Sequence, residues 1–159
     1  MTDRIHPIAQ FLKEHEEVLR HLQRLRKSSE ELMRNGYSKK LFDQFQAEVG
    51  FIAKEVGEHN RKEEQALFPV IEHYVEGPTQ VMRQEHKELD KLYQQLVRHV
   101  RAITKNKRST AALNGIHKTA KSIVQLMVNH IHKENSILFP MVQKFLSKEA
   151  LREVARRML

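Results

Sequence analysis

The stretch His59-Asn-Arg-Lys-Glu-Glu-Gln-Ala-Leu-Phe-Pro69 returns, with substitutions, as His130-Ile-His-Lys-Glu-Asn-Ser-Ile-Leu-Phe-Pro140. The two copies lie 71 residues apart (130 − 59 = 71). The same offset places Glu14-His15 on Glu85-His86, so the repeat extends beyond the quoted stretch. In a repeat protein each copy is one supersecondary unit. We therefore predict that the chain consists of two copies of one helical hairpin.

The repeat divides a single predicted domain, residues 1–159, into three segments. Two hairpins are predicted over about residues 1–76 and 77–147, and a short tail helix follows over residues 147–159. A chain of 159 residues can bury one core and needs no second domain. With 40% hydrophobic and 30% charged residues but only five glycines and four prolines, the composition favours an all-α protein over a turn-rich β fold.

Apolar residues recur every three or four positions along four segments, which is the pattern of helices packed in a bundle. The predicted helices run from about Pro7 to Arg34, from Ser38 to Pro69, from Thr79 to Thr104 and through Leu113 to Pro140. Asn35-Gly36 is expected to close the first helix, and Ser38 and Ser147 are expected to cap the second helix and the tail helix. Pro69 is expected to kink or break the second helix, because proline lacks an amide hydrogen.

Six polar residues replace apolar residues on these stripes: His15, His59, Glu63, His86, His130 and Glu134. A histidine and a glutamate four residues apart lie one turn apart on the same face of a helix. Two residues of an antiparallel hairpin share a height when they are equally far from its turn. The midpoints of the histidine pairs, (15 + 59)/2 = 37 and (86 + 130)/2 = 108, both fall in predicted turns. The six side chains are therefore predicted to lie in one layer.

A buried layer of this composition indicates a metal site. One histidine on an apolar stripe is usually a core residue, but two buried carboxylates without a lysine or arginine beside them are costly. Bound metal ions remove that cost, and a chain without cysteine can offer them only nitrogen and oxygen. Four histidines and two carboxylates suit iron, with zinc or manganese as alternatives. Two ions fit this set better than one, with Glu63 and Glu134 as bridges, while the pairing of histidines with ions stays open.

The other histidines lie off the stripes or beyond the repeated stretch. Five of them are predicted to be surface residues or to support the metal ligands: His6, His21, His99, His117 and His132. His73 extends the stripe of the second helix, but it lies beyond Pro69 and Lys144 occupies its repeat position. A core or surface role is therefore expected for His73.

The sequence resembles the hemerythrin-like HHE cation-binding domain family. The resemblance is carried by the six residues, by the Leu-Phe-Pro after each glutamate and by the segment Leu146-Ser-Lys-Glu149. This resemblance covers essentially the whole chain. It implies an up-down-up-down four-helix bundle around a non-haem site of two iron ions, joined by an oxo or hydroxo bridge. Asp90 stands where oxygen-carrying hemerythrins have a further histidine, and Asn135 stands where they have an aspartate. The ligand set is more similar to the branches of the family that repair iron clusters or sense iron.

Three classes of function stay open at this point. The leading hypothesis is a di-iron protein that interacts with O2, NO or peroxide, in sensing, scavenging, or iron donation and repair under oxidative or nitrosative stress. The second hypothesis is a di-iron enzyme of the oxidase or peroxidase type. The third hypothesis is a helical interaction module that binds no metal.

Charge and hydropathy narrow the range of partners. A net charge of +8 would attract phosphates or anionic lipid, but the basic clusters lack the interleaved aromatic residues and motifs of nucleic-acid-binding proteins. No run approaches the roughly 20 apolar residues of a membrane span, and the N-terminus has no apolar signal-peptide core. We expect a cytoplasmic protein whose partner is a small diatomic molecule or peroxide, not a membrane or a nucleic acid. The oligomeric state stays open.

Overall fold

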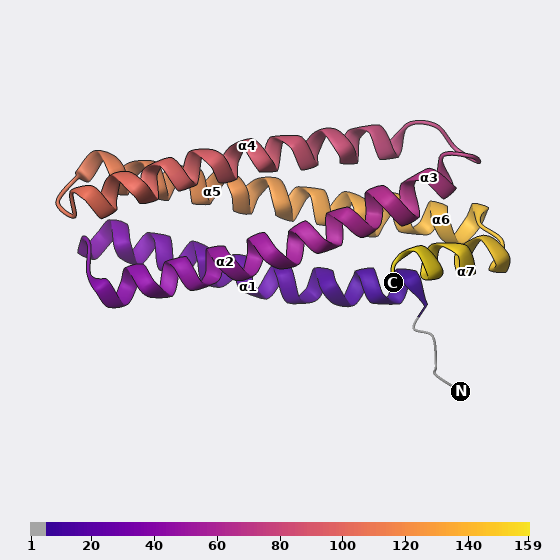
Figure 1. Ribbon diagram of the computed structural model, residues 1–159, viewed down its shortest axis with the longest axis horizontal. Coiled ribbons are helices and arrows are strands. Elements are labelled where there is room, and N and C mark those ends of the chain that lie inside the picture. The colour runs from indigo at the N-terminus through magenta and orange to yellow at the C-terminus, as the bar shows by residue number, and fades with distance from the viewer. Residues whose placement is uncertain (1–5) are drawn as a thin grey trace.

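The computed structural model describes residues 6–159, and this part of the chain contains helices and turns but no strand. The elements in chain order are α1 (Pro7–Asn35), α2 (Lys39–Lys62), η1 (Glu63–Leu67), α3 (Phe68–Ile71), α4 (Pro78–Lys105), α5 (Thr110–Lys133), η2 (Glu134–Leu138), α6 (Phe139–Phe145) and α7 (Lys148–Arg157) (Figure 1). The elements η1 and η2 are single π-helical turns that continue α2 and α5 without a gap. The predicted all-α class is confirmed.

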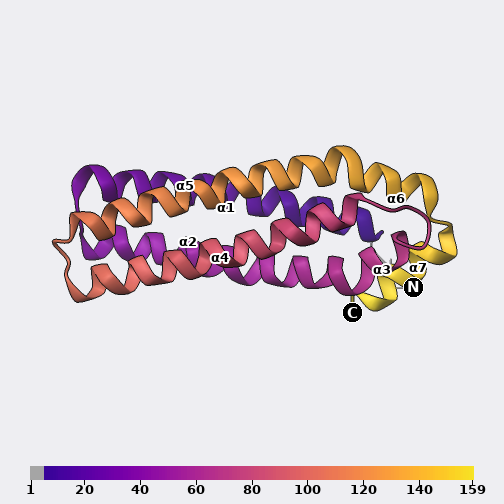
Figure 2. The ribbon, with the colours of Figure 1, turned by 90° about the horizontal axis from the view of Figure 1, so that it is seen from above.

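The four long helices run alternately up and down the bundle (Figures 1 and 2). Helices α1 and α2 form the first hairpin, α4 and α5 form the second, and α1 also packs along α5. The short helix α7 folds back across the end of the bundle where α1 begins, and it contacts α1 and η1. The fold is therefore an up-down-up-down four-helix bundle with a short C-terminal helix, as predicted.

Capping residues begin and end the helices at the predicted places. The side chains of Ser38 and Ser147 accept hydrogen bonds from backbone amides at the starts of α2 and α7. Helix α1 ends at Asn35, and Gly36 follows with a φ of 78°, a conformation that glycine adopts at little cost. The short turns keep the two helices of each hairpin antiparallel, so that residues equally far from a turn meet.

Each long helix turns its predicted stripe toward the interior. In α1 the buried residues are Pro7 and the predicted stripe, which runs from Ile8 to Leu32. The buried apolar residues form two clusters, one along most of the bundle and one at the end that α7 covers. On α1, Val18 belongs to the first cluster and Phe11 to the second, and His15 lies between them. Apolar packing therefore closes the polar layer from both sides.

The sequence predicts a kink or a break at Pro69, and of these the structure shows no break, because the helix continues through a π turn into α3. A proline ring within an α-helix collides with the carbonyl four residues earlier and cannot donate the next hydrogen bond. The backbone avoids this conflict by widening into η1, where the amide of Phe68 donates to the carbonyl of Glu63, five residues back. The helix then continues as α3, and the chain turns only after Ile71.

The second hairpin repeats this device at its own proline, Pro140. The amide of Phe139 donates to the carbonyl of Glu134 across η2, and α6 continues the helix. Single π turns inside α-helices occur frequently at functional sites. Here each π turn begins at one of the two buried glutamates, Glu63 or Glu134.

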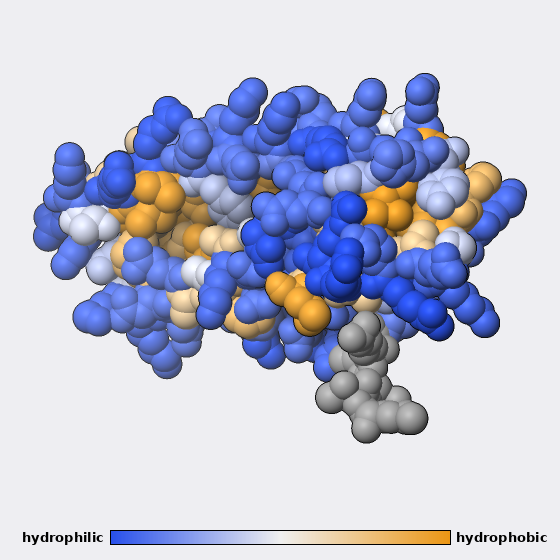
Figure 3. Space-filling view, turned by 45° about the vertical axis from the view of Figure 1, so that its right-hand side comes forward, coloured by the Kyte–Doolittle hydropathy of each residue, from blue (hydrophilic) through white to orange (hydrophobic). Residues whose placement is uncertain are grey.

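The outside of the bundle is mostly polar. On the face drawn in Figure 3, hydrophilic side chains cover most of the surface, and hydrophobic side chains show between them in separate patches. The larger exposed apolar residues include Val81, Ile137 and Phe145, which come from three different elements. Within residues 6–159, no helix has both the length and the apolar character that crossing a membrane requires.

Candidate metal centre

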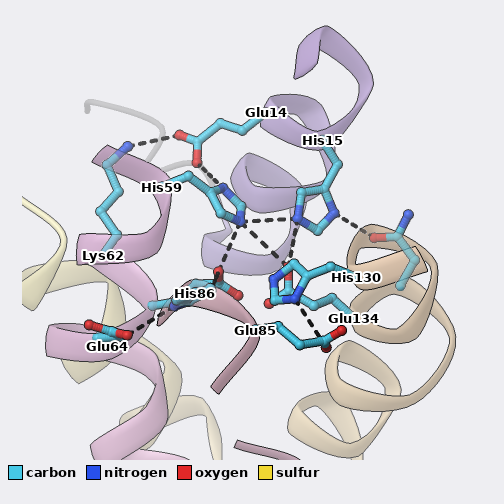
Figure 4. A network of polar contacts seen from close by, with 11 residues as sticks. Glu14, His15, His59, Lys62, Glu64, Glu85, His86, His130 and Glu134 are labelled. Atoms are coloured by element: carbon cyan, nitrogen blue, oxygen red, sulfur yellow. Dashed lines mark hydrogen bonds and ion pairs between the residues drawn. The ribbon is translucent and has the colours of Figure 1, made fainter. Parts of the chain in front are cut away.

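The six polar stripe residues converge in one buried layer inside the bundle. Figure 4 labels five of them, namely His15, His59, His86, His130 and Glu134. Their exposed fractions are 2% for His15, 5% for His59, 0% for Glu63, 5% for His86, 3% for His130 and 0% for Glu134. Two histidines come from the first halves of α1 and α4, the other two come from the last turns of α2 and α5, and the glutamates open the π turns. The layer predicted from the midpoints of the hairpins is where these side chains meet.

The inward atoms form two groups that share Glu134. One group consists of His15, His59 and Glu134, and the other consists of His86, His130, Glu63 and Glu134. Within each group the potential ligand atoms all lie within 4.8 Å of one another. Each group therefore takes its two histidines from one hairpin.

The distances show that these side chains aim at common points. The Nε2 atoms of His15 and His59 are 3.0 Å apart, and Nε2 of His15 is 3.0 Å from Oε1 of Glu134. Nε2 of His130 is 3.3 Å from the same oxygen. Oε1 of Glu63 lies 3.2 Å from Nε2 of His59, although Glu63 is grouped with the other two histidines. Both glutamates thus reach histidines of both hairpins, as bridging carboxylates would.

Several of these inward atoms have no hydrogen-bond partner among the described residues. They are both carboxylate oxygens of Glu63 and of Glu134, and Nε2 of His86 and of His130. A buried polar group without a partner costs about 1–3 kcal/mol, and a charged group costs more. Metal ions bound through nitrogen and oxygen would satisfy these atoms together, so the residues present fit a metal centre.

An outer carboxylate holds His59 from behind. Oε1 of Glu14 accepts a hydrogen bond from Nδ1 of His59 at 2.9 Å, and Oε2 of Glu14 accepts one from Lys62 at 2.8 Å (Figure 4). Because a carboxylate can only accept, Nδ1 must carry the proton. The lone pair of Nε2 then faces the interior, which is the tautomer that a metal ligand requires.

The second hairpin repeats this arrangement around His130. Nδ1 of His130 is 3.4 Å from Oε1 of Glu85, and Lys133 donates to Oε2 of Glu85 at 2.7 Å. All three residues follow their first-hairpin counterparts by the same 71 residues, since 85 − 14, 130 − 59 and 133 − 62 give the same number. The repeat therefore duplicates the support of the histidine as well as the histidine itself.

The remaining two histidines are held across the hairpins. Nδ1 of His86 in the second hairpin lies 2.9 Å from Oε1 of Glu64 in η1. Nδ1 of His15 in the first hairpin lies 2.7 Å from Oδ1 of Asn135 in η2. All four imidazoles thus have their Nδ1 atoms fixed from outside, and all four present Nε2 to the interior.

The carboxylates shift the pKa values of the imidazoles in the metal-free protein. Burial alone would lower the pKa of His59, but the charge of Glu63 and the contact with Glu134 outweigh burial and raise it well above the ordinary value. Burial also opposes the charged forms of His86 and His130, and contacts with Glu63 and Glu134 respectively raise their pKa values. Without metal, the buried carboxylates therefore favour the protonated forms of His59, His86 and His130.

The carboxylates respond in the complementary direction. Burial alone would raise the pKa of Glu14, but hydrogen bonds from His59 and Lys62 lower it to about 2. Burial likewise opposes ionisation of Glu134, yet its contacts with the surrounding histidines lower its pKa well below the ordinary value. Both carboxylates are therefore ionised near neutral pH, as a metal ligand and its outer support must be.

Three phenylalanines cover the layer on the side of α7. The ring centroids are 5.1 Å apart for Phe11 and His59, 5.3 Å for Phe139 and His15, and 6.0 Å for Phe68 and His86. All three phenylalanines are 2% exposed or less. Apolar aromatic side chains therefore close the layer on this side.

The other histidines belong to neither group of potential ligands in the described part of the chain. His6 accepts a hydrogen bond from the amide of Ile8 at the start of α1. Nδ1 of His21 lies 2.6 Å from Oε2 of Glu48, and neither residue belongs to the six-residue layer. His73 and His132 are exposed. The four histidines of the predicted layer are therefore the ones that cluster, whereas His73, which also extends a stripe, does not.

The sequence analysis missed the outer partners of the histidines. The repeat already aligns Glu14 with Glu85 and Lys62 with Lys133, so matched charges beside the predicted ligands were an available signal. No comparable signal marks Glu64 and Asn135, because the repeat places different residue types there.

Comparison with known proteins gives a family match and several relatives. The family described as hemerythrin HHE cation binding domain matches residues 6–142. The iron-sulfur cluster repair protein YtfE of Escherichia coli O157:H7 is 29% identical over 91 residues, which cover 55% of this chain and 41% of that protein. YtfE of Yersinia pseudotuberculosis serotype IB is 29% identical over 98 residues, which cover 59% of this chain and 44% of that protein. Each match spans less than half the length of the relative.

Proposed function

Because the chain belongs to the hemerythrin HHE cation-binding domain family, we propose that it is a non-haem di-iron protein that interacts with O2, NO or peroxide. In this proposal residues 6–159 form one domain of two hairpins and α7, and the two groups of inward atoms each hold one ion. The observation that carries the proposal is the set of buried, unpartnered oxygens and imidazole nitrogens that face one another between the hairpins.

The donor set favours iron over the alternatives. Imidazole suits zinc, copper, iron and nickel, while carboxylates add preference for harder ions, and no cysteine occurs in the sequence. His15, His59 and Glu134 form a two-histidine, one-carboxylate set, which is the ligand set of many non-haem iron(II) centres with open positions. Zinc or manganese in the same residues is the alternative that metal analysis would reveal.

The chain's own residues prepare the centre for a small ligand. Bound iron would supply redox chemistry and open coordination positions for a diatomic molecule or peroxide. The outer partners hold each imidazole with Nε2 inward, so that the donors need little rearrangement. The phenylalanine cover excludes bulk water and bulky solutes. The positions left unfilled by three or four protein donors are where a small molecule would bind.

A role in stress follows from this chemistry and from the relatives. These relatives are named iron-sulfur cluster repair proteins, and each is more than twice as long as its matched segment. For this chain we propose the corresponding class of role, namely sensing or scavenging of the small oxidant, or donation of iron under oxidative or nitrosative stress.

Titration with NO tests the ligand class directly. Iron(II)-loaded protein, titrated without oxygen, is expected to show a saturable change in its visible and EPR spectra at a fixed ratio of NO to iron. Zinc-loaded protein is the matched control and should show no change, because zinc has no redox or open-shell chemistry. An iron-loaded protein that responds to neither NO, O2 nor peroxide would contradict the proposal.

Peroxide consumption separates binding from catalysis. A binding or sensing protein consumes a fixed amount of peroxide per iron and then stops. Sustained turnover of many equivalents per iron, with an electron donor present, would instead place the protein with the di-iron enzymes.

A further inference from the structure

The residues that contact Nδ1 of the four histidines are of the same type for His59 and His130 but of different types for His15 and His86. His59 and His130 each contact a glutamate that is itself paired with a lysine, and these two sets are related by the repeat. The partner of His86 is the carboxylate of Glu64, whereas the partner of His15 is the amide of Asn135. These two outer residues occupy the same repeat position, since 135 − 64 = 71.

The two outer contacts have similar geometry but different charge. Nδ1 of His86 is 2.9 Å from Glu64, and Nδ1 of His15 is 2.7 Å from Asn135. Each outer residue directly follows a buried glutamate at the start of a π turn, so the backbone holds both in the same way. The repeat therefore provides an internal comparison in which the main difference is a negative charge on one side.

That charge falls on one of the two groups of potential ligands. The group of His86 and His130 is backed by two carboxylates, Glu64 and Glu85. The group of His15 and His59 is backed by one carboxylate and by the neutral Asn135. Charge-assisted hydrogen bonds are roughly twice as strong as neutral ones. An imidazole that donates Nδ1–H to a carboxylate is a more basic ligand, which stabilises the higher charge of a metal ion.

We propose that Glu64 and Asn135 are positioning residues that make the two metal positions unequal, so that iron held by His86 and His130 is oxidised before iron held by His15 and His59. This inference rests on the proposed di-iron function. During titration with ferricyanide, a one-electron oxidant, the first electron leaves the iron of His86 and His130 and reduces ferricyanide to ferrocyanide. One ferric and one ferrous ion then remain in the protein.

Over the potential range between the two expected oxidation steps, the position of His15 and His59 would retain iron(II), the state that binds a diatomic ligand. The position of His86 and His130 would already have supplied an electron. Glu63 contacts His59 as well as His86, so the inner carboxylates do not distinguish the two positions, and the outer charge of Glu64 does.

The test is a spectroelectrochemical redox titration of the iron-loaded full chain and its variants. The wild-type protein is expected to show two separate one-electron steps. Glu64→Gln removes the charge and raises the lower potential, while Asn135→Asp adds a charge and lowers the higher potential. Each variant should reduce the difference between the two redox potentials by at least about 59 mV. For a one-electron couple this corresponds to about a tenfold change in the equilibrium between the mixed-valent state and the two symmetric states.

Glu48→Gln is the matched control, because Glu48 also contacts a histidine, His21, at 2.6 Å but lies outside both groups. Its potentials should equal those of the wild type. Iron content is measured on every sample. Suppose that the wild-type protein holds two irons per chain. A single oxidation step, or a difference between the two potentials that neither site variant changes, would then overturn the inference and leave the proposed function intact. A wild-type protein that does not hold two irons would instead refute the proposed function. If Glu64→Gln fails to hold iron, the shift in Asn135→Asp decides alone.

Discussion

Replacing Glu134 by alanine is expected to empty both metal positions. Glu134 is fully buried and is the only residue common to both groups of potential ligands in the described structure. One of its oxygens lies within 3.7 Å of Nε2 of His15, of His59 and of His130. Loss of an outer partner alone typically costs about 10–100-fold in metal affinity, so loss of the shared ligand should cost more than about a hundredfold.

The measurement is iron per chain after identical loading and desalting. Glu63→Ala is expected to lose iron severely as well, because both of its buried oxygens face the imidazoles. His132→Ala and His21→Ala are the controls, since His132 is exposed and His21 contacts Glu48 instead. Circular dichroism confirms that each variant is folded. Equal iron loss in all four variants would contradict the assignment of the ligands.

The second large effect is a stabilisation by metal that disappears in mild acid. A ligand that binds only the native state stabilises it by about 4 kcal/mol at a thousandfold excess over its dissociation constant. At pH 7.5 the loaded protein should therefore melt well above protein stripped with a chelator. At pH 5.5 protons compete for the imidazoles, whose unperturbed pKa is about 6.5, so the gap between the two melting temperatures should close.

The pKa shifts in the metal-free protein also reduce the difference between the two melting temperatures at pH 5.5. The raised pKa values of His59, His86 and His130 contribute stability below the unfolded value of about 6.5, and that stability is lost as the pH rises through the folded values. The lowered pKa of Glu134 contributes stability at pH values above its ordinary pKa of 4.5. That stability is lost as the pH falls through the lowered pKa of the folded protein. At pH 5.5 the stripped protein therefore keeps both contributions, whereas at pH 7.5 it loses part of the first.

Thermal melts of loaded and stripped protein at the two pH values measure this effect. The Glu134→Ala variant provides the control and should show no gap at either pH, because it holds no metal to lose. Coincident melting temperatures of loaded and stripped wild-type protein at both pH values would mean that the histidine layer is not a metal site.

The sequence predicted most of the fold because the signals that decide it are local. The 3–4 spacing of apolar residues, the capping serines and Gly36 each act within a few residues, and the structure confirms them. The clustering of the six polar residues was also predictable, because equal distance from a short turn determines height in an antiparallel hairpin. Their assignment as metal ligands stays a proposal that the expected results above would test.

Other features depend on side-chain and backbone geometry that spacing does not reveal. The π turn before Pro69 was missed, because the sequence pattern does not show whether a helix breaks at a proline or widens before it. The contacts of Glu64 with His86 and of Asn135 with His15 join residues of different hairpins. Such contacts depend on how the hairpins are packed together, which the pattern within each hairpin does not specify.

The central claim is that these six residues hold two iron ions, and metal analysis of wild-type protein purified without a histidine tag tests it most directly. Elemental analysis combined with an accurate protein concentration gives the number and kind of metal atoms per chain. The two groups of inward atoms predict about two iron atoms per chain. A single stoichiometric zinc ion, or no metal after loading with iron(II) in the absence of oxygen, would contradict the claim.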